Sequence, residues 1–62
     1  MVAVFDRIRA ITKMRGMTIK EVERRAGLHN GTIGKWRKSS PRLKNLLAVA
    51  NVLGVKIETL LR

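Results

Sequence analysis

The sequence predicts an all-α fold of five short helices, and three observations support this prediction. Apolar residues recur at helical spacing in five segments, glycines follow several of these segments, and no segment alternates polar and apolar residues as a strand does. With 62 residues, the chain can form a single domain, 1–62, around one small core. A domain of this size buries only about 60% of the surface that its unfolded chain exposes.

The spacing of apolar residues predicts the first helix. Val4, Ile8 and Ile11 fall at positions i, i+4 and i+7, with Phe5 beside them, and therefore share one side of a helix. Three helix ends, beginning with that of this first helix, are marked by glycine, which adopts the left-handed conformation that often follows a helix. The glycines expected to end helices are Gly16, Gly27 and Gly54.

The second predicted helix, about 18–26, has strong local signals at its start. Thr18 and Glu21 have the spacing of a capping box, in which each residue satisfies a free donor of the other. Met17 and Val22 stand where a hydrophobic staple places its two apolar residues. These signals agree with one another, so we expect a stable helix here.

The third predicted helix, about 30–38, is less well supported. Ile33 and Trp36 form its apolar pair, at i and i+3. Gly31 and Gly34 are expected to lie inside it, and each costs about 0.8–1 kcal/mol of helix propensity relative to Ala. Such a conflict between local preference and the predicted structure is often found where function requires it.

The fourth helix is expected to begin with Ser40 as its cap and Pro41 in the first helical position, where a missing N–H does no harm. A last turn, 57–61, has a poor cap, so it should depend on packing. The predicted inward stripe of the fourth helix consists of Leu43, Leu46, Leu47, Ala50 and Leu53.

Charge is the strongest bulk feature. Fourteen Lys and Arg face four Asp and Glu, which gives a net charge of +10. A small domain this basic is expected to bind a polyanion, most often nucleic acid. A solvated basic surface is the simpler alternative, and membrane surfaces or acidic proteins are other partners to weigh. No apolar run approaches the ~20 residues of a membrane helix, and the first residues are not a secretory signal, so we expect a cytoplasmic protein.

The residues for catalysis are missing. The chain has one histidine and no cysteine, so it lacks disulfides and thiolate metal sites. Glu21 and Glu23 are two residues apart and diverge on a helix. His29 is expected to be a polar surface or cap residue. We therefore predict no enzyme activity, no metal and no cofactor.

Two short helices joined by a glycine-containing turn and followed by a basic cluster are typical of a helix-turn-helix that binds duplex DNA. Such a unit places the N-terminal residues of its second helix at base edges in the major groove. Asn pairs with adenine and Lys donates to guanine, whereas glycine allows close backbone approach. The candidate base-reading residues are Asn30, Gly31, Gly34 and Lys35.

Two of these assignments have alternatives. Asn is also a favoured N-cap, so capping the third helix is the alternative role for Asn30, in which case Lys35 would carry most of the base recognition. Gly31 and Gly34 are equally suited to relieving crowding between the two helices. The sequence leaves these alternatives open.

Phosphate contacts are expected around the base-reading residues. Helix N-termini bind anions through free N–H groups, and Thr18 and Pro41 mark two such ends. Basic residues lie near both ends and after the third helix, and each could also belong to a solvated face. They are Lys20, Arg42 and Lys44, together with Arg37 and Lys38 beside Lys35.

From Phe5 to Leu61, the chain resembles the Cro/CI-type (XRE-like) helix-turn-helix family, especially phage-repressor-like regulators. The resemblance rests on the order and spacing of many weak motifs. They are Ile8 and Ile11; Gly16, Met17 and Thr18; Glu21 and Val22; Gly27 and Leu28; Thr32, Ile33 and Trp36; Pro41, Leu43, Leu47 and Ala50; Leu53, Gly54 and Val55; and Leu60 and Leu61.

The resemblance implies a compact five-helix lambda-repressor-like domain that binds operator DNA sequence-specifically and regulates transcription, as a repressor. It implies that Asn30, Gly31, Gly34 and Lys35 face bases. The family's backbone-contacting positions correspond to Thr18, Lys20, Thr32, Lys38, Arg42, Lys44 and Asn45.

Two residues depart from the family pattern. Ile19 stands where the family often has Gln, and Glu23 stands where it usually has Ala. The larger, charged Glu23 is an unfavourable sign for close packing of the second helix on the third.

Two questions stay open. A helix-turn-helix can also serve as a protein-interaction or dimerisation module without specific DNA binding. A homodimer would use the C-terminal segment 55–61 or the N-terminal MVAV, and both segments are equally suited to packing on the core.

Overall fold

The computed structural model describes residues 3–61, and all regular structure in this range is helical. The all-α prediction is confirmed. The count of five α-helices is not, because the third element is a short 3-10 helix. The elements are α1 (Val4–Met14), α2 (Ile19–Arg25), the 3-10 helix η1 (Ile33–Arg37), α3 (Leu43–Leu53) and α4 (Ile57–Leu61).

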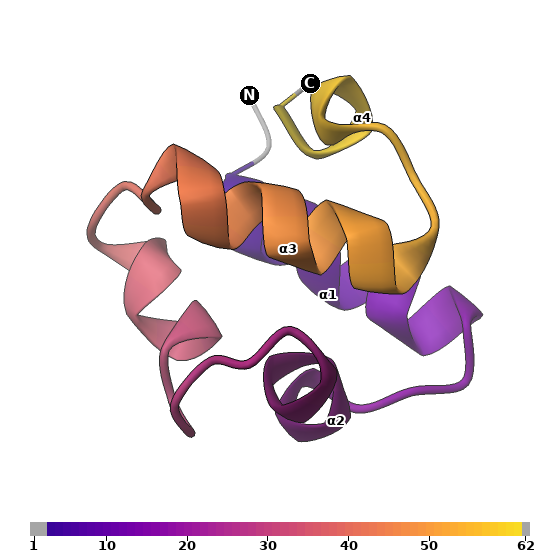
Figure 1. Cartoon of the computed structure of the whole chain (residues 1–62). Coiled ribbons are helices and arrows are strands. Elements are labelled where there is room, and N and C mark those ends of the chain that lie inside the picture. The colour runs from indigo at the N-terminus through magenta and orange to yellow at the C-terminus, as the bar shows by residue number, and fades with distance from the viewer. Residues whose placement is uncertain (1–2, 62) are drawn as a thin grey trace.

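The helix α1 is the centre of the arrangement. It contacts α2, η1 and α4, while α3 packs on α2 and α4. In Figure 1, α2 and η1 lie together at one end of the molecule, and α4 covers the opposite side. The molecule measures 26 × 21 × 17 Å. The two elements of the predicted helix-turn-helix are therefore supported from behind by α1 and α3.

Every element contributes to one core. Ile8 of α1, Val22 of α2 and Leu60 of α4 are fully buried. η1 contributes Ile33 and the single tryptophan, Trp36. The packing of α4 through Leu60 agrees with the expectation that this short turn depends on tertiary contacts.

The inward face of α1 is the predicted one in part, with its centre shifted towards Phe5 and Thr12. Phe5, Ile8 and Thr12 are buried, whereas Val4 and Ile11 are half-buried at the edge of the core. The two stripes share Ile8 and lie side by side on the helix. The neighbouring helices select the face that carries the aromatic ring, which buries more apolar surface than Val4 would.

The predicted start of α3 is wrong. Arg42 is its N-cap residue, with extended backbone, and Leu43 is the first helical residue, so Ser40 does not cap α3 and Pro41 lies before it. The backbone N–H and the hydroxyl of Ser39 both donate to the Lys35 carbonyl. This turn at the end of η1 uses Ser39, and Ser40 and Pro41 follow it before the start of α3.

The predicted inward stripe of α3 is also partly wrong. Leu43 and Leu47 are 64% and 48% exposed. Apolar residues occupy two sides of this helix, and the sequence pattern alone fits either side. The buried residues are Leu46, Val49, Ala50 and Leu53, which follow the i, i+3, i+4, i+7 spacing of a helix face.

Two adjacent leucines test this assignment. Leu46→Ala should lower the free energy of unfolding by about 2–5 kcal/mol, because it leaves a cavity in the core. Leu47→Ala should change it by about 0.5 kcal/mol or less, as most surface substitutions do. Urea unfolding followed by Trp36 fluorescence measures both. Equal losses would place Leu47 in the core and contradict the structure.

Candidate nucleic-acid interface

The helix α2 begins and ends as its local signals predict. The Thr18 hydroxyl accepts a hydrogen bond from the Glu21 N–H at 3.1 Å. Gly27 follows α2 with φ +74°, and the Leu28 N–H donates to the Glu23 carbonyl at 2.8 Å. The chain therefore leaves α2 through a tight, hydrogen-bonded turn, which directs it towards η1.

The side chain of Glu23 joins α2 to η1. Its carboxylate oxygens accept hydrogen bonds from the Gly31 N–H at 3.1 Å and from the Ile33 N–H at 2.8 Å. Glu23 is only 3% exposed. Glu23 therefore links α2 to η1 through hydrogen bonds, because its charge meets free N–H donors in the turn before η1 and at the first residue of η1.

The regular part of the third element is shorter than the predicted 30–38. The 3-10 helix covers Ile33–Arg37, and residues 30–32 form a turn before it. Gly31 lies in that turn with φ +90°, not inside a helix as predicted, while Gly34 is inside η1. A side chain at position 31 would be strained in this conformation, which explains one glycine of the pair.

Crowding does not explain the glycines. A Cβ atom added at Gly31 or at Gly34 would meet no atom within 4 Å, the two chain neighbours aside. The alternative that the glycines relieve crowding between α2 and η1 is therefore wrong. Gly34 instead leaves the outer side of η1 without a side chain.

Asn30 does not cap the third element. Thr32 occupies the cap position of η1 without a side-chain hydrogen bond, and the Glu23 carboxylate takes the role that Asn30 was suited to. The side chain of Asn30 is exposed and forms no hydrogen bond within residues 3–61. It is thus available to a ligand.

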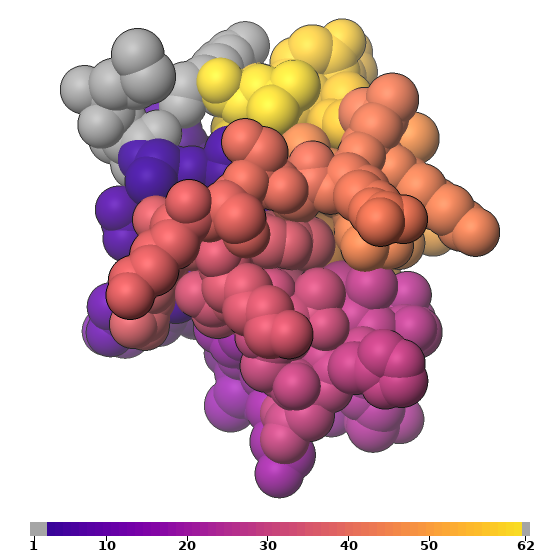
Figure 2. All heavy atoms as spheres, turned by 90° about the vertical axis from the view of Figure 1, so that its left-hand side faces the viewer, coloured from indigo at the N-terminus to yellow at the C-terminus, as the bar shows by residue number. Residues whose placement is uncertain are grey.

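The α2–η1 end of the molecule presents one continuous face. Figure 2 shows that η1 and the connection to α3 occupy the middle of this face, with α2 below them and α3 and α4 above. Asn30, Gly31 and Lys35 are exposed, and Gly34 is half-buried. The structure therefore brings the four candidate base-reading residues into one short, accessible segment.

The candidate phosphate-binding residues surround this segment on three elements. Thr18 and Lys20 are exposed at the start of α2, and Arg42 and Lys44 are exposed at the start of α3. Lys38 is exposed directly after η1. Thr32 and Asn45 are only half-buried. Pro41 does not mark a helix end, so the second N-terminus lies at Arg42.

A shallow groove of about 400 Å³ lies between α1, α2 and η1. Arg9, Lys20 and Arg37 line it, and Gly31 and Gly34 leave part of its surface without side chains. The Arg37 guanidinium lies 4.4 Å from the centre of the Phe5 ring, a cation–π contact that holds it against α1. Three cations therefore line the groove, together with the single carboxylate of Glu23.

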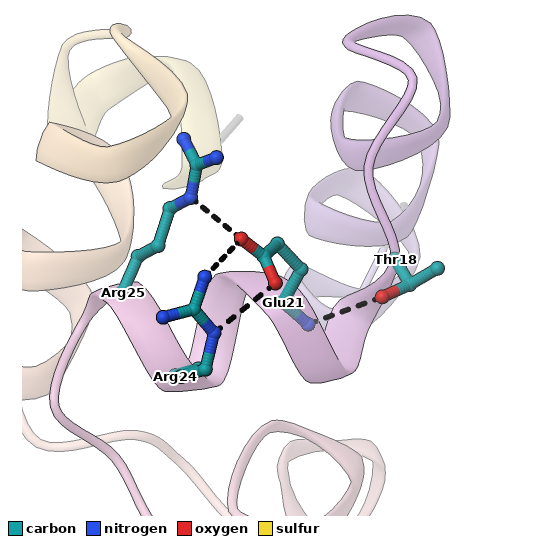
Figure 3. Close-up of polar contacts among 4 residues, drawn as sticks. All are labelled: Thr18, Glu21, Arg24 and Arg25. Atoms are coloured by element: carbon teal, nitrogen blue, oxygen red, sulfur yellow. Dashed lines mark hydrogen bonds and ion pairs between the residues drawn. The ribbon is translucent and has the colours of Figure 1, made fainter.

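Glu21 has a different partner from the one predicted. Figure 3 shows its carboxylate between the guanidinium groups of Arg24 and Arg25. The Nε atoms of these arginines lie 3.2 and 2.8 Å from it. The hydrogen bond from Arg24, and then that from Arg25, lowers the pKa of Glu21. Thr18 caps α2, but Glu21 does not complete the reciprocal capping box.

Comparison with known proteins assigns the family. A family model described as helix-turn-helix matches residues 8–60. The chain belongs to the Cro/CI-type helix-turn-helix family. A structure of the P22 c2 repressor in complex with the synthetic operator 9T, in the presence of Tl⁺, superposes with a TM-score of 0.85 at 26% identity. The match covers 97% of this chain and 94% of the repressor chain. No curated protein matched in the sequence comparison.

In this helix-turn-helix chain, two residues of the site were not identified from sequence. Glu23 was taken as unfavourable for close packing of two helices. Its hydrogen-bond partners are eight and ten residues away, and no sequence pattern marks their backbone N–H groups. Arg9 was not among the candidate residues, although it follows Phe5 by one helical turn on α1. That spacing was the available signal that Arg9 accompanies the Phe5 side of the helix.

Among residues 3–61, no helix is long and apolar enough to cross a membrane. Within the same residues, no group of three or more His, Cys, Asp or Glu side chains could hold a metal ion.

The Glu21 interaction predicts a pH effect on stability. A carboxylate whose pKa is lowered on folding stabilises the folded state above its usual value of 4.5, and this stabilisation is lost as pH falls through the lowered pKa. The melting temperature of the wild-type protein should therefore fall more steeply below pH 4.5 than that of Glu21→Gln. Thermal unfolding of both proteins between pH 7 and pH 2 measures the difference. Parallel curves would contradict the prediction.

Proposed function

We propose that this protein is a transcriptional regulator of the repressor type, which binds double-stranded operator DNA sequence-specifically. The observation that carries the proposal is the accessible segment around η1, which belongs to a helix-turn-helix pair in a chain with a net charge of +10. The similarity to a repressor solved with its operator supports the same function.

The segment from Asn30 to Lys35 is proposed to read bases in the major groove. Asn30 and Lys35 supply the side chains, as amide and ammonium groups able to pair with adenine and guanine edges. Gly31 and Gly34 supply close approach of the backbone. Their exposed or half-exposed positions support this assignment.

The surrounding polar and basic residues are proposed to bind phosphates. They lie on elements on both sides of η1, which suits contacts to the two backbones that border a groove. Such contacts fix the orientation of the protein without carrying sequence information. The proposed phosphate-binding residues are Thr18, Lys20, Thr32, Arg37, Lys38, Arg42, Lys44 and Asn45.

A homodimer through the C-terminal segment is a further part of the proposal. Val55 and Ile57 pack against the core and Leu60 is buried, so less apolar surface is free there than the sequence predicts. Leu61, 56% exposed, is the residue of α4 that supports such a contact. Met1 and Val2 of the MVAV alternative lie outside the described residues, and Val4 packs against the core. The molar mass in solution distinguishes monomer from dimer.

Salt dependence tests DNA binding. Five of the proposed phosphate-binding residues are cations, and neutralising five phosphates predicts a slope of roughly −4.5 for log K against log salt concentration. Titration of a labelled duplex at several salt concentrations, followed by fluorescence anisotropy, measures the slope. A flat dependence, or no duplex binding at low salt, would favour a protein-interaction module instead.

Two lysines test the division between base and phosphate contacts. Lys35→Ala should reduce the preference for the best duplex over other sequences, because a base contact discriminates by about 1–3 kcal/mol. Lys44→Ala should weaken all duplexes nearly equally. Selection from random duplex DNA identifies the best sequence, and competition titrations measure the preference. Uniform weakening by both substitutions would show that Lys35 binds only phosphate.

A further inference from the structure

We propose that Glu23 is a positioning residue for base recognition, an inference that rests on the proposed function. Its carboxylate holds the backbone at Gly31 and Ile33, and this sets the conformation in which Asn30 and Lys35 meet the DNA. Glu23 itself is 3% exposed. It acts through the segment from Asn30 to Lys35, the recognition segment, and does not contact the bases.

The recognition segment has little stability of its own. η1 has five residues, far below the ~12–15 that an isolated helix needs in water. Gly34 lowers its helix propensity further. Thr32, at the cap position, forms no side-chain cap. The Glu23 carboxylate therefore accepts hydrogen bonds from N–H groups that the local sequence leaves unsatisfied.

The two bonds are placed where they control the proposed base-reading residues. Asn30 directly precedes the anchored Gly31, and Gly34 and Lys35 follow the anchored Ile33 by one and two residues. A glycine with φ +90° has wide conformational freedom when it is not held. Fixing its N–H removes that freedom before DNA binds, so less ordering is left for the complex to drive.

The charge of Glu23 allows an effect on sequence discrimination to be distinguished from an effect on general DNA affinity. The carboxylate lies in the groove that Arg9, Lys20 and Arg37 line. A negative charge there opposes phosphate binding, so its removal should leave general affinity for DNA unchanged or raise it. Loss of the anchor should instead reduce discrimination between sequences. A merely structural role would not move these two quantities in different directions.

The experiment compares three variants with the wild-type protein. Glu23→Gln removes the charge and one strong acceptor, and Glu23→Asp keeps the charge but shortens the side chain by one methylene. Glu21→Gln is the matched control, since it makes the same chemical change two residues away, on a carboxylate that binds only Arg24 and Arg25. The probes are the duplex recovered by selection with the wild-type protein and a shuffled duplex of the same composition.

The measured quantity is the dissociation constant for the shuffled duplex divided by that for the selected duplex, so a larger ratio means stronger discrimination. Both Glu23 variants should reduce this ratio about tenfold, the equivalent of one charge-assisted hydrogen bond. Glu23→Gln should bind the shuffled duplex at least as well as the wild-type protein does. Glu21→Gln should keep the wild-type ratio within about twofold, as expected for an exposed ion pair. Wild-type ratios in both Glu23 variants would overturn the proposal.

A second measurement, amide hydrogen exchange, uses the wild-type protein and so does not depend on the folding of a variant. In the DNA-free wild-type protein, the amide hydrogens of Gly31 and Ile33 should exchange more slowly than that of Asn30, because both are hydrogen-bonded to Glu23. Unprotected amides at these positions would overturn the anchoring role. Wild-type protein that binds no duplex but protects these amides would overturn the proposed function, so the two failures are distinguishable.

Discussion

The hydrogen bonds from Gly31 and Ile33 to the Glu23 carboxylate are the interaction on which the exposed end of the molecule depends. Other contacts of η1 place it on the core through Ile33 and Trp36, but they act on its inner side. The carboxylate acts at its first residues, where backbone donors would otherwise lack partners. A buried charge is tolerated there because it is paired with donors and with the positive end of the helix.

The parts of the fold that were predicted correctly are those with local causes. Thr18 caps α2, and Gly16, Gly27 and Gly54 adopt the left-handed conformation after their helices. In each case the partner lies within one helical turn, so the sequence pattern contains the whole interaction. The glycine requirement is also independent of the rest of the fold, since other residues rarely adopt a positive φ.

The errors arise where distant residues decide between local alternatives. Leu43 and Leu47 fit an inward stripe as well as Val49 does, and only the positions of α2 and α4 select one face. Glu23 was misjudged, and Asn30 left undecided, for the same reason. Whether a carboxylate disturbs a helix pair or joins it depends on donors eight and ten residues away, whose positions follow from the turn after α2.

The division between α2 and η1 has a consequence for recognition. α2 is stabilised by its own sequence, whereas the segment from Asn30 to Lys35, which is proposed to face DNA, carries two glycines and depends on a side chain from α2. Asn30 and Lys35 are the two side chains proposed to pair with bases, and each good pair contributes about 1–3 kcal/mol of discrimination. The binding free energy of a specific DNA site is typically about 4–10 kcal/mol more favourable than that of non-specific DNA for the same protein. One copy therefore reaches only the lower part of that range, and longer operators require DNA shape or a second copy to supply the rest.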